Sequence, residues 1–243
     1  MTHPFPIKQL RFFLTAPAPC PYLPGKMERK LFTHLHVLDG PELNDSLTQA
    51  GFRRSQNIVY RPACENCSAC ISARVVAGRF RPSRSQKRVL KRNQDLTLTI
   101  AAALASDAHY ALLLRYVRAR HPDGGMEDMS YADYLSMVED TAARSQVCEY
   151  RDAQGKLLAA ALVDQLSDGP SLVYSFYEPG EEKRSLGSYI ILDHVRQAVQ
   201  NGQPYVYLGF WIRDSRKMRY KAQYRPLEIL RTGGWLELGD EDL

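Results

Sequence analysis

The stretch EPGEEKRSLGSYIILDHV, residues 178–195, decides the fold that this sequence predicts. It joins a segment typical of a strand, SLVYSFYEP, which ends at Pro179, to a helix expected over 187–200. The apolar residues of that helix recur at helical spacing, and a glycine follows its end. A further apolar segment, YVYLGF (205–210), predicts the strand that comes next. The expected order of strand, loop, helix and strand indicates an α/β fold.

The start of this helix is a candidate binding site for an anion. Gly187 lets backbone N–H groups approach a ligand closely, and the helix dipole favours negative charge at that end. An ordinary first helical turn is the alternative explanation for a single glycine. Two strands expected before it, VCEYRD and KLLAAALVDQL, give the order strand, strand, strand, loop, helix, strand. That order resembles acetyltransferases of the GNAT type, so we expect an α/β (α+β) protein with a GNAT-like acyltransferase domain.

Length and composition fit either one large domain or two small ones. The 243 residues are 44 % hydrophobic and 24 % charged, which is typical of a globular protein. No stretch approaches the roughly 20 apolar residues of a membrane helix, and residues 1–11 lack the apolar core of a secretory signal. We therefore expect a cytoplasmic protein without a membrane partner. We expect a smaller cysteine-containing domain over 1–100 and the GNAT-like domain over 101–243.

Positive charge is concentrated in two segments, although the formal net charge is only +5. No acidic residue lies between Glu65 and Asp95, and a helix expected near 83–95 carries much of this basic run. A second basic segment spans 213–231. Two such segments predict a polyanionic partner. A solvated charged surface is the alternative.

Three of the five cysteines lie close together with the spacing C-x2-C-x2-C, at Cys64, Cys67 and Cys70. Thiolates on one short loop can bind a soft metal centre, and Cys20 is the candidate for a fourth ligand. We therefore expect a zinc ion or an iron–sulfur cluster at these residues. A reduced cluster without metal is the alternative. Cys148 is expected to be a small core residue.

Several segments together resemble the aminoacyl-tRNA–protein transferases, the family of eukaryotic arginyltransferase. Within that family the sequence is most similar to the bacterial aspartate/glutamate leucyltransferases. The similarity runs in order over nearly the whole chain. It is carried by CPYLPG (20–25), GFRRSQNIVYRPACENCSACISARV (51–75), SFYEPGEEKRSLGSYIILDHV (175–195), YVYLGFWI (205–212) and KMRYKAQYRPLEIL (217–230).

The resemblance implies a reaction and its partners. Members of the family take an amino acid from its tRNA ester and join it by a peptide bond to a protein N-terminus. The bacterial subgroup uses leucyl-tRNA and proteins with N-terminal Asp or Glu, which it marks for degradation by the N-end rule pathway. Two positions depart from the family. Leu23 replaces a second cysteine of the eukaryotic enzymes, and Glu178 stands before Pro179 where the family has aspartate.

The chemistry of ester aminolysis indicates what the catalytic site must do. An α-amine has a pKa of about 7.7–8.0, so a useful fraction is neutral at pH 7. The protein must mainly hold amine and carbonyl at attack distance and stabilise the oxyanion. We expect Glu178 to bind or deprotonate the amine and Tyr177 to contact the terminal base or the leucine. The alternatives are a turn role for Glu178 and core packing for Tyr177.

Three binding surfaces are expected for these substrates. The aminoacyl end of the tRNA is expected at Arg184, Ser185, Leu186, Gly187, Ser188 and Tyr189. The tRNA backbone is expected at Arg84, Lys87, Arg88, Lys91 and Arg92. The acidic N-terminus of the acceptor is expected at Arg213, Arg216, Lys217 and Lys221.

Other functions remain open at this point. They are arginyl transfer, acetyl transfer from acetyl-CoA by a GNAT enzyme, and redox-sensing binding of nucleic acid without catalysis. The pyrophosphate of acetyl-CoA does not need as much positive charge as the two basic segments carry, which argues against acetyl-CoA as the donor. The strand–glycine loop–helix unit argues against a protein that only binds.

Overall fold

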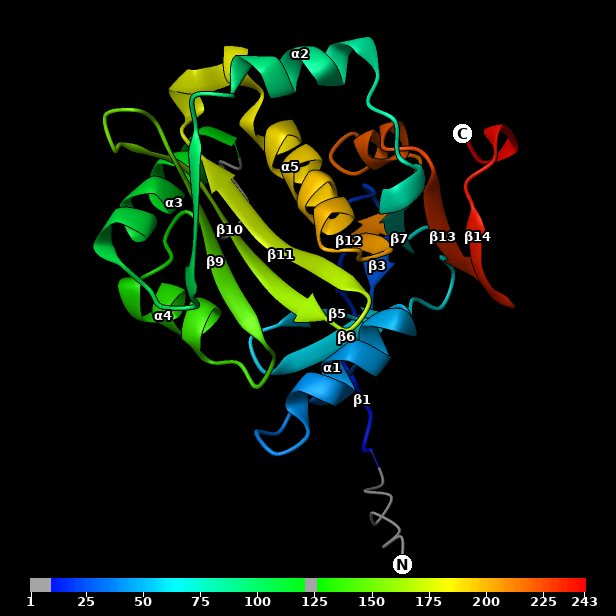
Figure 1. Ribbon diagram of the computed structural model, residues 1–243. Helices are drawn as coiled ribbons and strands as arrows, with labels where there is room; N and C mark the ends of the chain where they lie inside the picture. The colour runs from blue at the N-terminus through cyan, green and yellow to red at the C-terminus, as the bar shows by residue number, and fades with distance from the viewer. Residues whose placement is uncertain (1–9, 121–125) are drawn as a thin grey trace, which may run out of the picture.

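The computed structural model describes residues 10–120 and 126–243 as a large mixed sheet with helices on both faces, beside a smaller sheet (Figure 1). Most of the segment considered as a secretory signal lies outside these residues, so the structure does not address that expectation. Across the described ranges, no helix combines the length and apolar character needed to cross a membrane.

The large sheet holds eight strands and supports the candidate site. In spatial order they are β14 (Gly234–Glu237), β13 (Leu227–Arg231), β7 (Ile71–Val76), β12 (Tyr205–Trp211), β11 (Gly169–Tyr177), β10 (Leu157–Leu166), β9 (Ser145–Arg151) and β8 (Thr97–Ala102). Every neighbouring pair is antiparallel except β11 and β12, which are parallel. The helix α5 (Leu186–Gln200) connects these two strands. The expected α/β class with its strand–loop–helix–strand unit is confirmed.

Helices cover both faces of this sheet, so its central strands are buried on both sides. Along β10, Ala159 and Ala161 pack with residues of α5, whereas Ala160 and Leu162 pack with α3 (Asp107–Arg120) and α4 (Tyr131–Glu139). This explains why KLLAAALVDQL is almost continuously apolar rather than alternating. Cys148 is fully buried in the cluster with α5, as expected.

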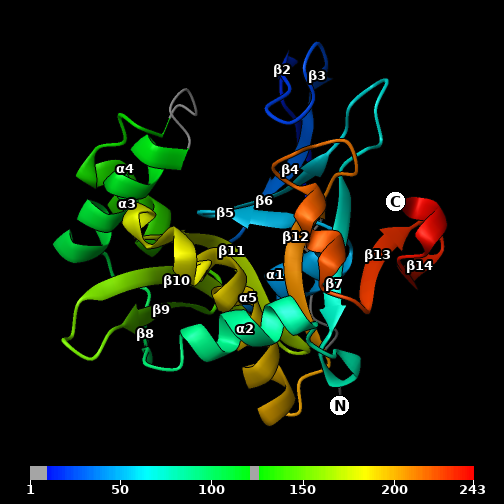
Figure 2. The ribbon, with the colours of Figure 1, turned by 90° about the horizontal axis from the view of Figure 1, so that it is seen from above.

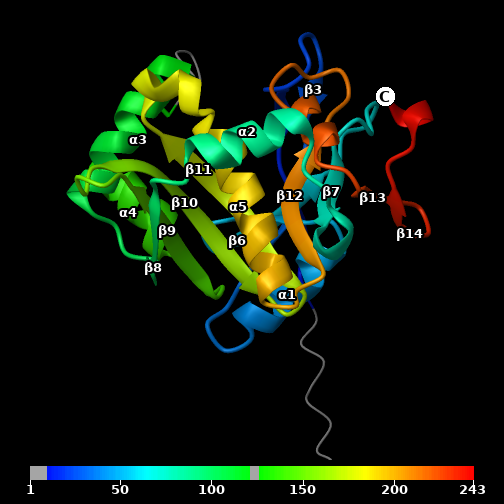
Figure 3. The same ribbon diagram turned by 45° about the horizontal axis from the view of Figure 1, so that its top comes forward.

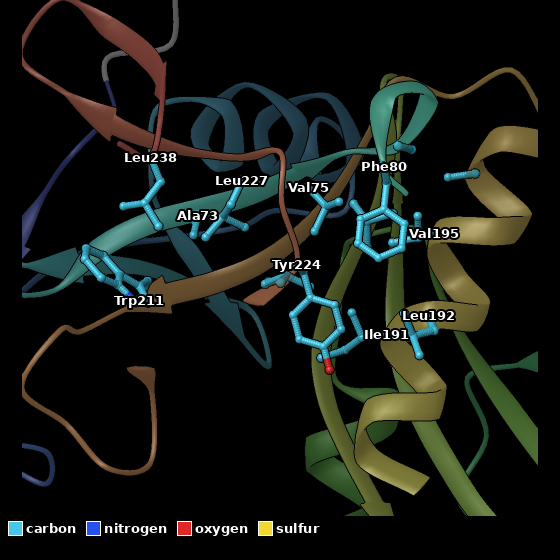
Figure 4. Packing of buried hydrophobic residues seen from close by; sticks show 14 of the residues in the cluster. Ala73, Val75, Phe80, Ile191, Leu192, Val195, Trp211, Tyr224, Leu227 and Leu238 are labelled. Carbon is cyan, nitrogen blue, oxygen red and sulfur yellow. The ribbon is translucent and has the colours of Figure 1, made fainter. Parts of the chain in front are cut away.

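A further helix, α2 (Arg84–Arg92), crosses α5 on its outer side (Figure 3). Val89 and Leu90 anchor it to the core beneath. Figure 4 shows the neighbouring part of that core, where Ile191 and Val195 of α5 point toward Tyr224 and Phe80. The basic helix is therefore fixed against the central helix of the fold.

The smaller sheet is built from the first part of the chain. Its order is β1 (Phe13–Leu14), β4 (Lys30–His34), β6 (Ile58–Pro62) and β5 (Arg53–Ser55), and a hairpin of β2 (Ala18–Pro19) and β3 (Met27–Glu28) lies apart from it. The helix α1 (Gly40–Gln49) packs on this sheet through Leu47, beside Phe52 and Val59. β5 also contacts β11 of the large sheet.

The division of the chain at residue 100 stays a prediction. β7 and α2 precede that residue but are built into the layer of the large sheet, and β8 spans it. The smaller sheet ends at Pro62. The sequence pattern also predicts YVYLGF as the last core strand, which is wrong: after η3 (Arg219–Gln223) the β13–β14 hairpin follows, and β13 pairs with β7 through buried residues.

Candidate functional site

The parallel strands β11 and β12 separate soon after they begin (Figure 2). They share one register pair, Ser171 with Tyr207, and the pairing does not continue toward Tyr177 at the end of β11. Both strands are irregular just beyond that pair. Val173 is left out of the register with β10, and Leu208 is left out of the register with β7. Because such bulges bend a strand and interrupt its ladder, the sheet opens between the two strand ends.

The start of α5 lies at this opening. The 3-10 helix η2 (Pro179–Arg184) leads to Ser185, whose left-handed backbone has a φ of 53° and turns the chain into α5. No side chain caps the helix there. Leu186 is buried beneath, while Gly187 and Ser188 are half-buried. The first N–H groups of α5 can therefore bind an anionic or developing negative group of a ligand.

The structure gives Gly187 a more specific role than close approach of a ligand. A Cβ atom at this position would lie 3.0 Å from Cε1 of Tyr177. Glycine thus lets the Tyr177 ring lie against the start of the helix. The ring also packs edge-on against Tyr116 at 4.8 Å between centroids, and its hydroxyl accepts a hydrogen bond from Arg120 at 3.1 Å. Tyr189, in contrast, is only 4 % exposed and lies in the core.

The side chain of Arg184 is held by the protein itself. Two hydrogen bonds of 2.9 Å to Asp95 raise the pKa of Arg184 and lower that of Asp95. The buried Asn93 donates to the carbonyl of Arg184 at 2.8 Å, and Arg92 donates to the carbonyl of Lys183. The end of α2 therefore fixes the loop before α5. A ligand at this helix start would meet backbone groups rather than a free Arg184 side chain.

Glu178 directly follows β11 and is paired with α3. Its carboxylate accepts hydrogen bonds of 3.2 and 3.0 Å from Arg115, and its side chain is 16 % exposed. An amine that reaches this carboxylate must share it with the guanidinium. The expected contact between Glu178 and the amine stays a prediction.

The helix α2 presents its basic side chains to solvent. Ser83 and Gln86 exchange the two hydrogen bonds of a capping box, which satisfies N–H groups at the helix start. Because no acidic residue lies between Glu65 and Asp95, nothing within the helix offsets its charge. The exposed side chains are the expected set Arg84, Lys87, Arg88, Lys91 and Arg92.

The second expected set of cations divides into two groups. Arg213, Arg216 and Lys217 are exposed in the segment after β12. Lys221 lies in η3, is only 4 % exposed, and donates a hydrogen bond of 2.5 Å to the carbonyl of Phe210. Burial, followed by the charge of Arg53, lowers the pKa of Lys221 well below its usual range. Lys221 is therefore a buried amine rather than a surface cation, and its charged form is less favoured than that of an exposed lysine.

The expected cysteine cluster lines one cavity of about 240 Å³. Burial, followed by the charges of the other three cysteines, raises the pKa of the Cys70 thiol to about 12. Thiols that share a cavity suit a soft metal in their donor chemistry. Across residues 10–120 and 126–243, however, no group of three or more ligating side chains is arranged to hold an ion. A metal bound by Cys20, Cys64, Cys67 and Cys70 stays a prediction.

Several residues at the opening were not predicted from the sequence. Arg115 and Arg120 reach it from α3, Asp95 from the turn after α2, and Arg53 from β5. Their partners lie 57 to 120 positions away along the chain. No local spacing could have revealed these contacts, and only the basic character of the Arg53–Arg54 pair was visible.

An open pair of parallel strands, with a helix start at the opening, is the arrangement expected of a GNAT-like acyltransferase, and α2 adds an exposed basic surface beside it. Two family profiles agree with this class. The profile described as "Arginine-tRNA-protein transferase, N terminus" matches residues 18–88, and that of the C terminus matches residues 108–231. The chain belongs to the arginine-tRNA-protein transferase family.

Curated relatives are similar over almost the whole chain. An aspartate/glutamate leucyltransferase of Caulobacter vibrioides is 59 % identical, covering 97 % of this chain and 86 % of the relative. One of Phenylobacterium zucineum is 56 % identical, covering 100 % and 96 %. Among solved structures, the C-terminal domain of a putative lysylphosphatidylglycerol synthetase from Agrobacterium fabrum has a TM-score of 0.48 and 15 % identity, covering 80 % of this chain and 66 % of that one. That likeness is too low to bear on function.

Proposed function

We propose that this protein transfers leucine from leucyl-tRNA to the N-terminal Asp or Glu of proteins and so marks them for degradation by the N-end rule pathway. The observation that carries this proposal is the identity of 56–59 % with relatives named aspartate/glutamate leucyltransferase, over nearly the full length of each chain. Leucyl-tRNA and protein N-termini are both available in the cytoplasm, where we expect the reaction.

The geometry of the opening supports acyl transfer. The reaction is attack of a neutral α-amine on the ester carbonyl, with a peptide bond formed and the tRNA hydroxyl released. Because the ester is already activated, orientation of the two groups can supply about 7–11 kcal/mol of the barrier. The N–H groups at the start of α5 are suited to the developing oxyanion. Tyr177 lies beside them and offers a ring to the terminal adenine or the leucine.

The basic helix α2 supports tRNA as the acyl donor. Hydrogen bonds from Arg92 and Asn93 connect its end directly to the loop before α5. If the acceptor arm of the tRNA lies on α2, its aminoacyl end would therefore point toward the opening between β11 and β12. The same surface makes acetyl-CoA a weaker candidate, since a pyrophosphate occupies only one helix start. Arginyl transfer remains a candidate because the family profiles carry that name.

Leucine transfer is tested with purified protein and labelled acyl donors. Leucyl-tRNA, arginyl-tRNA and acetyl-CoA are each offered with peptides that begin with Asp, Glu, Lys or Ala. We expect label from leucyl-tRNA on the Asp and Glu peptides alone. Absence of leucine from both of these peptides would contradict the proposal. Label from arginyl-tRNA or acetyl-CoA in its place would identify arginyl transfer or acetyl transfer as the function instead.

Gly187→Ala is expected to slow leucine transfer about tenfold without lowering the stability of the fold. The new methyl group lies 3.0 Å from the Tyr177 ring, so the ring must shift, and small displacements in an active site have large effects on rate. Alanine also favours the helix by up to about 1 kcal/mol. Single-turnover rates and thermal unfolding are the measurements.

Gly180→Ala is the matched control, because nothing lies within 4 Å of a Cβ at that position in η2, the segment that leads to α5. It should leave the rate unchanged. An equal effect of the two substitutions would show that the contact with Tyr177 is not the cause.

A further inference from the structure

Arg53 occupies the opening between β11 and β12. Its Nη2 donates hydrogen bonds to the carbonyl oxygens of Val173 at 2.9 Å and Leu172 at 3.5 Å. Val173 is the residue that falls out of register in β11. On the side of β12, the guanidinium carbon lies 5.9 Å from the centroid of the Phe210 ring. A cation from the smaller sheet therefore lies between the two separated strands.

Gly209 in β12 provides the space for this guanidinium. Its φ is +71°, and a Cβ atom there would lie 1.8 Å from Nη1 of Arg53. Any other residue would have to displace the arginine and would also be strained in that conformation. The bulge in β11 and the glycine in β12 thus form a slot for Arg53.

Lys221 brings a buried amine to the same place. Its Nζ donates to the carbonyl of Phe210, the residue whose ring faces Arg53. Burial and, after it, the charge of Arg53 lower the pKa of Lys221, so an anion bound beside both groups would favour the charged form of the amine. Arg53 contacts β11 at Val173, and the same strand ends at Tyr177, whose ring lies against Gly187 at the start of α5.

Among the residues that the structure describes, neither Arg53 nor Lys221 has a carboxylate partner. In the part of the chain that the structure describes, Arg53 donates to backbone carbonyls, and Lys221 donates to a carbonyl and to the sulfur of Met218. Buried charges in proteins are ordinarily paired, as the adjacent Arg54 is with Asp164. A guanidinium without a carboxylate partner, beside a buried amine that an anion would help to protonate, favours an anion from outside the chain.

We propose that Arg53 and Lys221 form the subsite that binds the side-chain carboxylate of the acceptor N-terminus. This inference rests on the proposed function. A guanidinium matches the two oxygens of a carboxylate, and burial strengthens the attraction. An N-terminal Asn or Gln would leave both cations unpaired, so the subsite also excludes the amides. The exposed Arg213, Arg216 and Lys217 would attract the acidic terminus from a distance.

The test compares kcat/KM for peptides that begin with Asp, Asn, Glu and Gln, with leucyl-tRNA as the donor. In Arg53→Gln and Lys221→Met the preference for Asp over Asn should fall on the order of a hundredfold. The low rate with Asn should stay nearly unchanged. Arg53→Lys should keep part of the preference for Asp, because lysine keeps the positive charge but lacks the paired N–H donors of the planar guanidinium.

Two further variants separate recognition from folding. Gly209→Ala leaves every charge in place but displaces the guanidinium, so it should lower the preference as Arg53→Gln does. Arg61→Gln removes an exposed arginine of the same small sheet, which lies over Phe52, and should change nothing. Thermal unfolding of each variant checks the fold.

The possible outcomes are distinct. An unchanged preference in Arg53→Gln and Lys221→Met would overturn the subsite, and so would an equal loss of rate for all four peptides, which indicates a structural role. If the unmodified protein transfers leucine to none of the peptides, the proposed function itself fails.

Discussion

Replacement of Arg54 by alanine is expected to lower the free energy of unfolding by about 3–5 kcal/mol. Arg54 lies on β5, and its guanidinium makes hydrogen bonds of 2.6 and 2.7 Å to the two carboxylate oxygens of Asp164 on β10. Each side chain is only 1 % exposed. Without the arginine, the buried carboxylate would keep Asn44 and Ser145 as its side-chain hydrogen-bond donors among the described residues.

This pair also connects the smaller sheet to the large one. Its loss should therefore loosen β5, which carries Arg53 into the opening, and leucine transfer should fall together with stability. For a chain of this size the melting temperature should drop by roughly 6–20 °C. Thermal unfolding followed by circular dichroism is the measurement.

Arg144→Ala is the matched control for Arg54→Ala. Arg144 pairs with Glu42 at 2.6 Å, but the two side chains are 58 % and 68 % exposed. Exposed pairs contribute about 0–1 kcal/mol, so the melting temperature should hardly change. A loss of less than about 1 kcal/mol in Arg54→Ala would show that the buried pair does not hold the two sheets together.

Reversing three charges of α2, in the variant Lys87→Glu, Arg88→Glu and Lys91→Glu, is expected to weaken leucyl-tRNA binding on the order of a hundredfold at low salt. For each phosphate that the helix no longer neutralises, the slope of log affinity against log salt should also fall by about one. These side chains are exposed on a helix whose end is joined by a hydrogen bond to the loop before α5. Titrations at several salt concentrations measure both effects.

The control conserves charge, with Lys87→Arg, Arg88→Lys and Lys91→Arg in one variant. It should bind tRNA nearly as the unmodified protein does, because phosphate binding without base contacts depends mainly on charge. Circular dichroism must show that α2 persists after charge reversal, since a glutamate in place of Lys91, near the C-terminus of the helix, opposes the helix dipole. Unchanged tRNA binding after reversal would exclude α2 from the tRNA site.

The elements around the candidate site could be predicted because their signals are local. The helix expected over 187–200 is α5, and YVYLGF is β12. The basic run became α2 because a capping box begins it and Val89 and Leu90 give it an apolar side. Periodicity and capping depend on residues only a few positions apart, so the sequence displays them directly.

The environment of the predicted residues was not visible in the same way. Arg184 was expected to be free for a ligand, but Asp95 holds it across 89 positions. Lys221 was expected on the surface, but η3 folds it against Phe210. Gly187 was explained by ligand approach, whereas the nearest atoms belong to Tyr177. Each difference comes from packing between segments far apart in the chain.

The sequence by itself determined the acyl-transfer unit, the exposed basic helix and the family, because these depend on local pattern and on segments that match in order. Only the tertiary structure decided where the parallel strands open and which charges meet there. Arg53 reaches Val173 across 120 positions of chain, and no spacing rule connects them. The cause is physical: a bulge, a glycine and a buried cation become one site only when distant strands pack together.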